Sequence, residues 1–359
     1  MLHGRSVPAA PVFALGDDDT TGRWARYNWA NYLARSGFRV FIMDLQGSGL
    51  STRSPQMDVA CNAFKGDQSK LAPYPLPTGA CDEDYPFPRY LNQVETDLAE
   101  LHAVISWIRG TAGVQKVNLV GHSAAAHIVG PYVMKWPDWV ESLFLLAPIF
   151  PPYGLGDRPP FMPPPEPPVP YPLPPLPDRF RCPMFITSRD QFMADWNAEA
   201  PQRETGIEDF VWNEIMKLDP VGATWGSQGV IRWRNSAWYG WTKSKVESND
   251  ALGVSVPVAI VYGTSDQQIN QLSSTLPSVP SDTQKPGPPF SVEWLFRAIP
   301  GDRKLMVSID KTGHFMPWET QHYVLHRYSA DWIRNKSIDW QNSGAWQRDT
   351  YGQLVPVAV

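Results

Sequence analysis

The sequence predicts an α/β fold with a mostly parallel sheet, because short buried strands alternate with helical segments along the chain. Four runs are apolar and rich in Val, Ile and Leu, as fully buried strands are, and they span residues 117–120, 140–149, 256–263 and 304–309. The segment 90–110 instead repeats apolar residues at helical spacing and carries acidic residues on its other face. Such alternation places helices against both faces of one sheet.

Length and charge restrict the class of function. With 359 residues, the chain can bury a large core and still carry an insertion of about a hundred residues. Its net charge of −5 and its lack of basic clusters argue against nucleic acid or an anionic membrane as a partner. No apolar run approaches the roughly 18 residues of a membrane span, and no secretory leader pattern precedes the first motif. We therefore expect a soluble protein with a neutral, largely apolar small-molecule substrate; its compartment and oligomeric state stay open.

The first elements of the chain follow the same rules. Residues 21–37 place aromatic and aliphatic side chains at helical spacing and end at a glycine, as helices often do. Residues 39–45 are predicted to form a buried strand, and a tight turn follows in which Asp44, Gly47 and Gly49 are expected to have structural roles.

The segment 52–88 is rich in Pro, Gly and polar residues and is predicted to form a long surface excursion near the edge of the sheet. Of the three cysteines, Cys61 and Cys81 bracket this irregular segment. They either form a disulfide, which leaves Cys182 as a thiol, or remain unpaired; the sequence favours neither arrangement.

The most informative stretch is residues 117–127, where a strand, a sharp turn and a helix follow each other within a dozen residues. A turn this sharp forces its central residue, Ser123, into a strained backbone conformation and lifts its side chain clear of the sheet. Small neighbours are needed on both sides, and Gly121 and Ala125 occupy those positions.

The G-x-S-x-A pattern of this stretch resembles the nucleophile elbow of the α/β-hydrolase fold. Two further motifs strengthen the resemblance: Asp266 follows the strand 256–263, and His314 lies in a Gly-His-Phe loop after the strand 304–309. The chain order Ser123, Asp266, His314 is the order found in that family. The resemblance therefore implies a nucleophile at Ser123, a general base at His314 and an orienting acid at Asp266.

In the same family, a His-Gly pair ends the third strand, and here it is His3-Gly4. The resemblance implies an oxyanion hole formed by the backbone N–H groups of Arg5 and Ala124. It also implies a mostly parallel, doubly wound sheet whose first strands are missing or shortened, because the motif lies so near the start of the sequence.

The resemblance implies a division into a core, residues 1–150 and 251–337, and a large helical, proline-rich cap, residues 151–250, followed by a tail, residues 338–359. The proline-rich run 150–177 is expected to be extended rather than helical, and most cap tryptophans are expected to form its core, with one or two in the pocket. The six cap tryptophans are Trp196, Trp212, Trp225, Trp233, Trp238 and Trp241.

A serine at the elbow implies an acyl-enzyme, and the expected activity is cleavage of a carboxylic ester or lactone of a bulky apolar molecule. The sequence shows no metal-ligand cluster, no dinucleotide fingerprint and no phosphate loop, so no cofactor or metal is implied. A non-hydrolytic member of the same fold, such as an acyltransferase, a cofactor-free lyase or cyclase, or a ligand-binding protein, is the alternative, since complete triads occur outside hydrolases.

Overall fold

The structure is a computed structural model of the chain, and it describes residues 1–72, 91–150, 182–199, 202–237, 250–270 and 290–359. The remaining segments include Cys81, most of the proline-rich run, Trp238 and Trp241, so the expectations for these residues lie outside the described part. Within the described residues, Cys182 is a buried thiol and Cys61 is disulfide-bonded.

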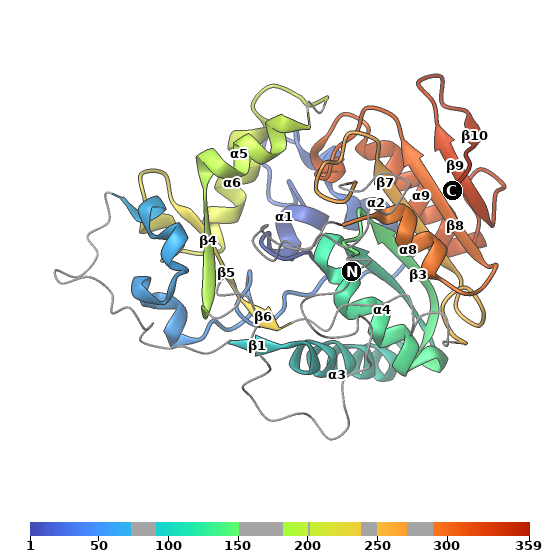
Figure 1. Cartoon of the computed structure of the whole chain (residues 1–359), viewed down its shortest axis with the longest axis horizontal. Helices are drawn as coiled ribbons and strands as arrows, with labels where there is room; N and C mark the ends of the chain where they lie inside the picture. Colours follow the sequence, from blue (N-terminus) through green and yellow to red (C-terminus); the bar gives the residue numbers. More distant parts are fainter. Residues whose placement is uncertain (73–90, 151–181, 200–201, 238–249, 271–289) are drawn as a thin grey trace, which may run out of the picture.

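Regular elements cover most of the described chain (Figure 1). The helices are α1 (Ala9–Phe13), α2 (Trp29–Arg35), α3 (Val94–Ala112), α4 (Ala126–Lys135), α5 (Arg189–Ala198), α6 (Ile207–Lys217), α8 (Val292–Ala298) and α9 (His322–Asn335). The strands are β1 (Asn92–Gln93), β2 (Val117–His122), β3 (Val140–Leu146), β4 (Met184–Ser188), β5 (Val230–Arg234), β6 (Ser236–Ala237), β7 (Val258–Gly263), β8 (Lys304–Ile309), β9 (Gly344–Arg348) and β10 (Leu354–Pro356).

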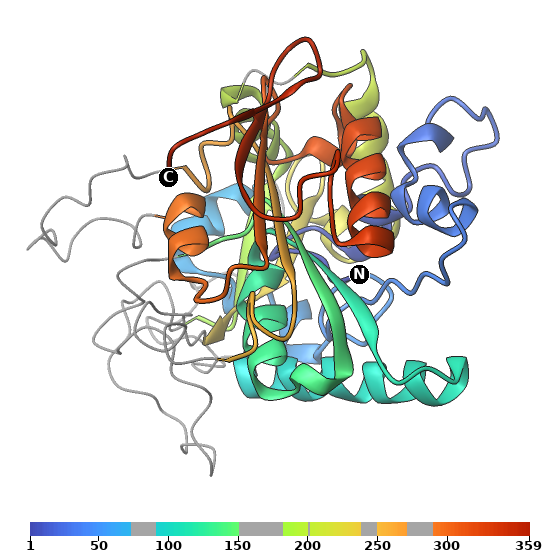
Figure 2. The same ribbon diagram turned by 90° about the vertical axis from the view of Figure 1, so that its right-hand side faces the viewer.

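A six-stranded sheet with the order β10-β9-β8-β7-β3-β2 forms the centre of the molecule. All its neighbours pair in parallel except β10, which is antiparallel to β9. β3 and β7 are buried almost throughout, which explains why their sequences are continuous apolar runs. Seen edge-on in Figure 2, the sheet has α9 on one face and α8 on the other. The fold is therefore the doubly wound α/β arrangement that the sequence predicts.

The first strands of the sheet are reduced to bridges. Leu2 pairs in parallel with both Met43 and Gly121, so Met1–His3 lies between β2 and the segment around Met43. The predicted strand 39–45 is wrong beyond that single bridge. Its backbone pairing among the described residues amounts to this bridge, with a hydrogen bond from the Met43 N–H to the Met1 carbonyl oxygen (3.2 Å), and this is too little for a ladder.

The tail after residue 337 also differs from expectation. The sequence analysis gives residues 338–359 only as a tail, but β9 pairs in parallel with β8 and β10 closes the edge of the sheet. Residues 344–356 therefore extend the core sheet. Their side chains are exposed or half-buried, so the sequence lacks the apolar run that marks the central strands.

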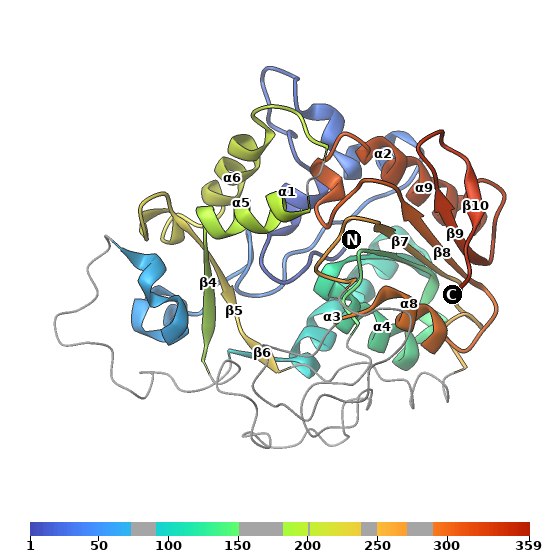
Figure 3. The same ribbon diagram turned by 45° about the horizontal axis from the view of Figure 1, so that its top comes forward.

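The inserted region contains α5 and α6, and it also contains an antiparallel pair of strands, β4 and β5. This pair lies to one side of the main sheet, and α5 and α6 lie next to it (Figure 3). The described part of the insertion is therefore a mixed α and β unit, whereas the sequence analysis expects a helical one.

The segment 52–72 is not a simple surface excursion. Met57, Ala63 and Leu71 are buried against residues of β4 and β5 in a second, smaller apolar cluster. Arg232 of β5 is buried as well, and it forms ion pairs with Asp219 (2.6 Å) and Asp58 (2.8 Å). The segment is thus packed and charge-paired against the insertion.

None of the helices in the described ranges is long and apolar enough to cross a membrane.

Candidate active site

Ser123 lies at the turn between β2 and the short helix Ser123–Ala125 that precedes α4, and its φ of +56° is in the left-handed region. That conformation strains any residue with a side chain. Small neighbours make the turn sterically feasible. A Cβ on Gly121 would lie 2.9 Å from Val129 Cγ2, and a Cβ on Gly4 would lie 2.9 Å from Ser123 Cβ. Gly4 and Gly121 therefore leave the space that Ser123 needs to adopt its strained conformation.

The structure brings Ser123, His314 and Asp266 together in one hydrogen-bonded chain. Ser123 Oγ lies 2.9 Å from His314 Nε2, and His314 Nδ1 lies 2.8 Å from Asp266 Oδ2. With the imidazole proton on Nδ1, Nδ1–H donates to the carboxylate and Nε2 accepts from the serine hydroxyl. The three side chains are at most 6% exposed.

Asp266 follows β7, and its orientation is fixed by its own turn. Its Oδ1 accepts the backbone N–H groups of Gln268 (2.9 Å) and Ile269 (3.3 Å), which leaves Oδ2 for His314. Asp310, which follows β8, is instead near Thr264, whose hydroxyl lies 3.4 Å from its Oδ1. Of these two acids, Asp266 is the one that contacts His314.

The electrostatic setting of His314 favours its protonated form. Burial alone lowers the pKa of His314, but the carboxylate of Asp266 and, after it, that of Glu199 outweigh burial and raise this pKa above its ordinary value. His122, whose ring centre is 5.2 Å away, stays neutral because burial lowers its pKa to about 3. Its Nε2 lies 3.2 Å from the His314 carbonyl oxygen, to which it donates.

Two further carboxyl groups hold the loop that carries His314, and the sequence analysis assigned neither. Glu199, at the end of α5, accepts the backbone N–H of His314 at 2.6 Å. Glu319 accepts the backbone N–H of Gly313 at 2.9 Å. Both side chains are at most 3% exposed. Burial raises the pKa of Glu319 to about 8, and the charge of Glu199 adds to this effect.

Gly313 is required between these two groups. A Cβ at this position would lie 2.3 Å from Glu199 Oε2 and 3.1 Å from Glu319 Oε1. Contacts that short are not tolerated, so a side chain here would displace a carboxyl group. The glycine that marks the His314 loop in the sequence therefore has a steric reason that only the folded chain shows.

A small cavity of about 40 Å³ adjoins Ala124, the residue after Ser123. Its lining includes Gly4, Arg5, Ile128 and Trp233 and the charged residues Asp97 and Arg234. This volume is sufficient for a water-sized group such as a carbonyl oxygen. Trp233 comes from β5 of the insertion, and the Arg5 guanidinium lies 4.3 Å from the centre of its ring. The structure thus places both residues expected at the oxyanion hole at one cavity.

The cap tryptophans separate into two groups. Trp196, Trp212 and Trp225 are at most 3% exposed and belong to apolar clusters. Trp233 is less buried and lines the cavity beside Ala124. Among the described cap tryptophans, Trp233 is therefore the candidate for substrate contact.

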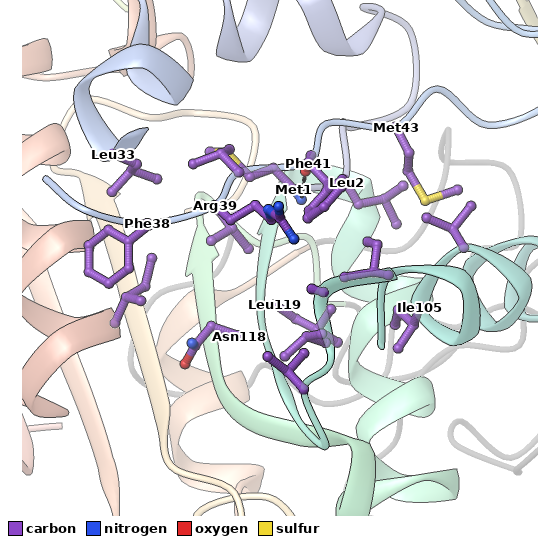
Figure 4. Close-up of a pocket in the computed structure, with 18 of the residues that line it drawn as sticks. Met1, Leu2, Leu33, Phe38, Arg39, Phe41, Met43, Ile105, Asn118 and Leu119 are labelled. Carbon is purple, nitrogen blue, oxygen red and sulfur yellow. Dashed lines mark hydrogen bonds between the residues drawn. The ribbon is translucent and has the colours of Figure 1, made fainter. Parts of the chain in front are cut away.

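A larger apolar cavity of about 300 Å³ lies elsewhere, between the N-terminal stretch, α3 and β2. Figure 4 shows Leu2, Ile105 and Leu119 around it, each from a different one of these segments. Ser123 and His314 do not line it, and neither do the oxyanion-hole candidates Arg5 and Ala124, so it is separate from the candidate active site. The described residues include no group of three or more His, Cys, Asp or Glu side chains that could hold a metal ion.

Comparisons with known proteins place the chain in a family. No curated protein sequence matches it significantly. Similar solved structures are a serine hydrolase from Cycloclasticus zankles (11% identity, 94% of this chain and 90% of that chain, TM-score 0.49), an esterase from Thermogutta terrifontis (14%, 93% and 88%, TM-score 0.43) and a monoacylglycerol lipase from Paleococcus ferrophilus (14%, 94% and 93%, TM-score 0.44). A family model described as the alpha/beta hydrolase fold matches residues 15–321, most of the sequence. The chain therefore belongs to the α/β-hydrolase fold family.

Proposed function

We propose that the protein is a serine hydrolase that cleaves a carboxylic ester or lactone of a bulky apolar small molecule through an acyl-enzyme intermediate. The observation that carries the proposal is the buried hydrogen-bonded chain from Ser123 Oγ through His314 to Asp266. The positive φ of Ser123, which presents the hydroxyl at the elbow, supports it.

In the proposed mechanism, Ser123 Oγ attacks the carbonyl carbon of the ester while its proton moves to His314 Nε2. Asp266 accepts Nδ1–H, holds the imidazole in the reactive tautomer and stabilises the imidazolium. The same proton then moves from Nε2 to the leaving alkoxide, so that an alcohol departs and the acyl group remains on Ser123. A water molecule repeats the sequence: its proton goes to Nε2, and the carboxylic acid and free serine are formed.

The backbone N–H groups of Arg5 and Ala124 are proposed to bind the oxyanion formed in both steps. Both residues line the same small cavity, and the close approach of Gly4 to Ser123 brings this segment to the nucleophile. Preorganised donors of this kind typically contribute 10²–10³ in kcat per donor.

We assign residues 1–150 and 251–337, together with β9 and β10, to the catalytic core, and residues 151–250 to a cap. The described cap elements support this assignment, because Glu199 contacts His314 and Trp233 lines the cavity at Ala124.

The test combines an ester and lactone panel with covalent labelling. The wild-type protein should hydrolyse p-nitrophenyl esters, with rates that depend on acyl size, and a fluorophosphonate probe should label Ser123. Ser123→Ala should lose both reactions and keep its circular dichroism spectrum, because only the Oγ is removed. Turnover by Ser123→Ala at the wild-type rate would refute the proposal, and so would labelling without turnover of any ester or lactone.

A further inference from the structure

Glu199 connects the cap to both loops of the proposed triad. Its Oε2 accepts the backbone N–H of His314 at 2.6 Å, while its Oε1 lies 3.5 Å from the side-chain amide nitrogen of Gln268. The backbone N–H of Gln268 in turn donates to Asp266. One carboxyl group at the end of α5 therefore contacts the His314 loop directly and the Asp266 loop through Gln268.

Aromatic packing fixes the position of Glu199. Phe192 and Trp196 of α5 pack against Phe315, with ring centres 5.3 and 5.7 Å apart, and Trp196 also lies 5.4 Å from Trp318. These rings are at most 8% exposed. The end of α5 is thus held against the residues that directly follow His314, and its carboxyl group has little freedom to turn away.

From this arrangement we propose that Glu199 is a positioning residue of the active site, through which the cap holds His314 in place and stabilises the imidazolium that forms when His314 accepts the Ser123 proton. The inference rests on the proposed function and adds to it a residue outside the triad. It also gives the cap a role in the chemistry, beyond covering the substrate.

The electrostatics agree with this role. Burial, and after it the carboxylate of Asp266, raise the pKa of Glu199 to about 7, whereas His314 acts to lower it. A negative charge on Glu199 is therefore most favourable while His314 is positive. Because His314 must be neutral to accept the Ser123 proton and is positive in the transition states, this interaction strengthens as the reaction proceeds.

The other titratable groups around His314 do not replace Glu199. Asp266 occupies Nδ1, and His122 on β2 stays neutral, with its pKa lowered to about 3 by burial. Glu319 holds Gly313 rather than His314, and burial raises its pKa to about 8, although the Arg203 guanidinium acts against this. Among the described residues, two carboxyl groups raise the pKa of His314 by their charge: Asp266 and, after it, Glu199.

The variant Glu199→Gln separates charge from shape. The amide retains an oxygen that can accept the His314 N–H, but it carries no charge. We expect the acidic limb of kcat/KM to move to lower pH, because the pKa of His314 falls when the charge of Glu199 is removed. The plateau should drop about tenfold through kcat, as loss of one charge-assisted contact predicts, with KM little changed. Glu199→Ala, which removes both charge and acceptor, should lose about a hundredfold.

The matched control is Asp209→Asn, an exposed acid of α6 that forms an ion pair with Arg189. This variant should keep the wild-type plateau of kcat/KM and the wild-type position of its acidic limb. The same pH series is measured for the rate at which a fluorophosphonate probe labels Ser123, since this reaction also needs His314 but no ester. If the wild-type protein hydrolyses no ester, the proposed function fails, and the labelling profile still decides the role of Glu199. If the acidic limb of the pH profile does not move in Glu199→Gln, the proposal is overturned, whatever the height of the plateau. This result does not depend on whether Glu199→Ala folds.

Discussion

Glu319→Gln should stabilise the protein, and only at neutral to alkaline pH. Glu319 is 1% exposed, and burial, reinforced by Glu199, raises its pKa from the ordinary 4.5 to about 8. The unfolded chain therefore releases this proton near pH 4.5, whereas the folded protein retains it until about pH 8. Between these values, rising pH favours the unfolded state, because that state binds fewer protons.

The size of the effect follows from the two pKa values. At about 1.36 kcal/mol per pH unit, Glu319 destabilises the folded wild type by roughly 4 kcal/mol more at pH 9 than at pH 5. Glutamine at this position retains an acceptor for the Gly313 N–H and does not titrate. For 359 residues the unfolding entropy is about 0.75 kcal/mol/K, so the thermal midpoint of the variant should gain about 5 °C relative to wild type between these pH values.

The assay is thermal unfolding of both proteins at pH 5, 7 and 9 at constant ionic strength, followed by circular dichroism. Glu141→Gln, at an exposed position of β3, serves as the control for replacing a carboxyl group by an amide. An equal midpoint difference for Glu319→Gln at pH 5 and pH 9 would refute the reasoning, because it would show that Glu319 ionises normally in the folded protein.

Three other outcomes follow from single contacts. Gly4→Ala should lower kcat/KM for p-nitrophenyl acetate about a hundredfold, since its Cβ would lie only 2.9 Å from Ser123 Cβ and would displace the nucleophile; wild-type kinetics would contradict this. Asp266→Asn should lower kcat about 10⁴-fold, because the amide no longer selects the reactive tautomer; in single-turnover kinetics, a loss below tenfold would remove Asp266 from the proposed triad. Asp219→Asn should destabilise the protein by about 3 kcal/mol, because the buried Arg232 loses its closest ion pair; unchanged urea unfolding would show that Asp58 suffices.

The central sheet could be predicted from the sequence because its strands are local apolar runs. β3 and β7 are buried on both faces, so nearly every residue in them is hydrophobic. β9 gives no such signal, since its residues are exposed or half-buried. The segment 39–45 has the composition of a strand, yet among the described residues it forms a single bridge, between Met43 and Leu2. Strand pairing depends on two segments, so the composition of one segment does not predict it.

In the candidate site, too, some residues could be predicted from the sequence and others could not. Ser123 and His314 stand in turns whose glycines are visible in the sequence, because the backbone geometry there demands small residues. Glu199 has no comparable signature. It is one acid at the end of an ordinary helix, and its contact with His314 depends on how α5 packs against Phe315 and Trp318. Only the tertiary structure could reveal it.

The hydrogen bond from His314 to Glu199 has a consequence for engineering. Caps of hydrolases are attractive parts to exchange, since a core and a cap taken from different enzymes offer a simple route to new selectivity. In this chain, a foreign cap would remove the acceptor of a buried backbone N–H next to the imidazole, and an unsatisfied donor of this kind costs about 1–3 kcal/mol. A chimera would therefore need an acidic residue grafted at the end of its first cap helix before its selectivity could be compared with that of the parent.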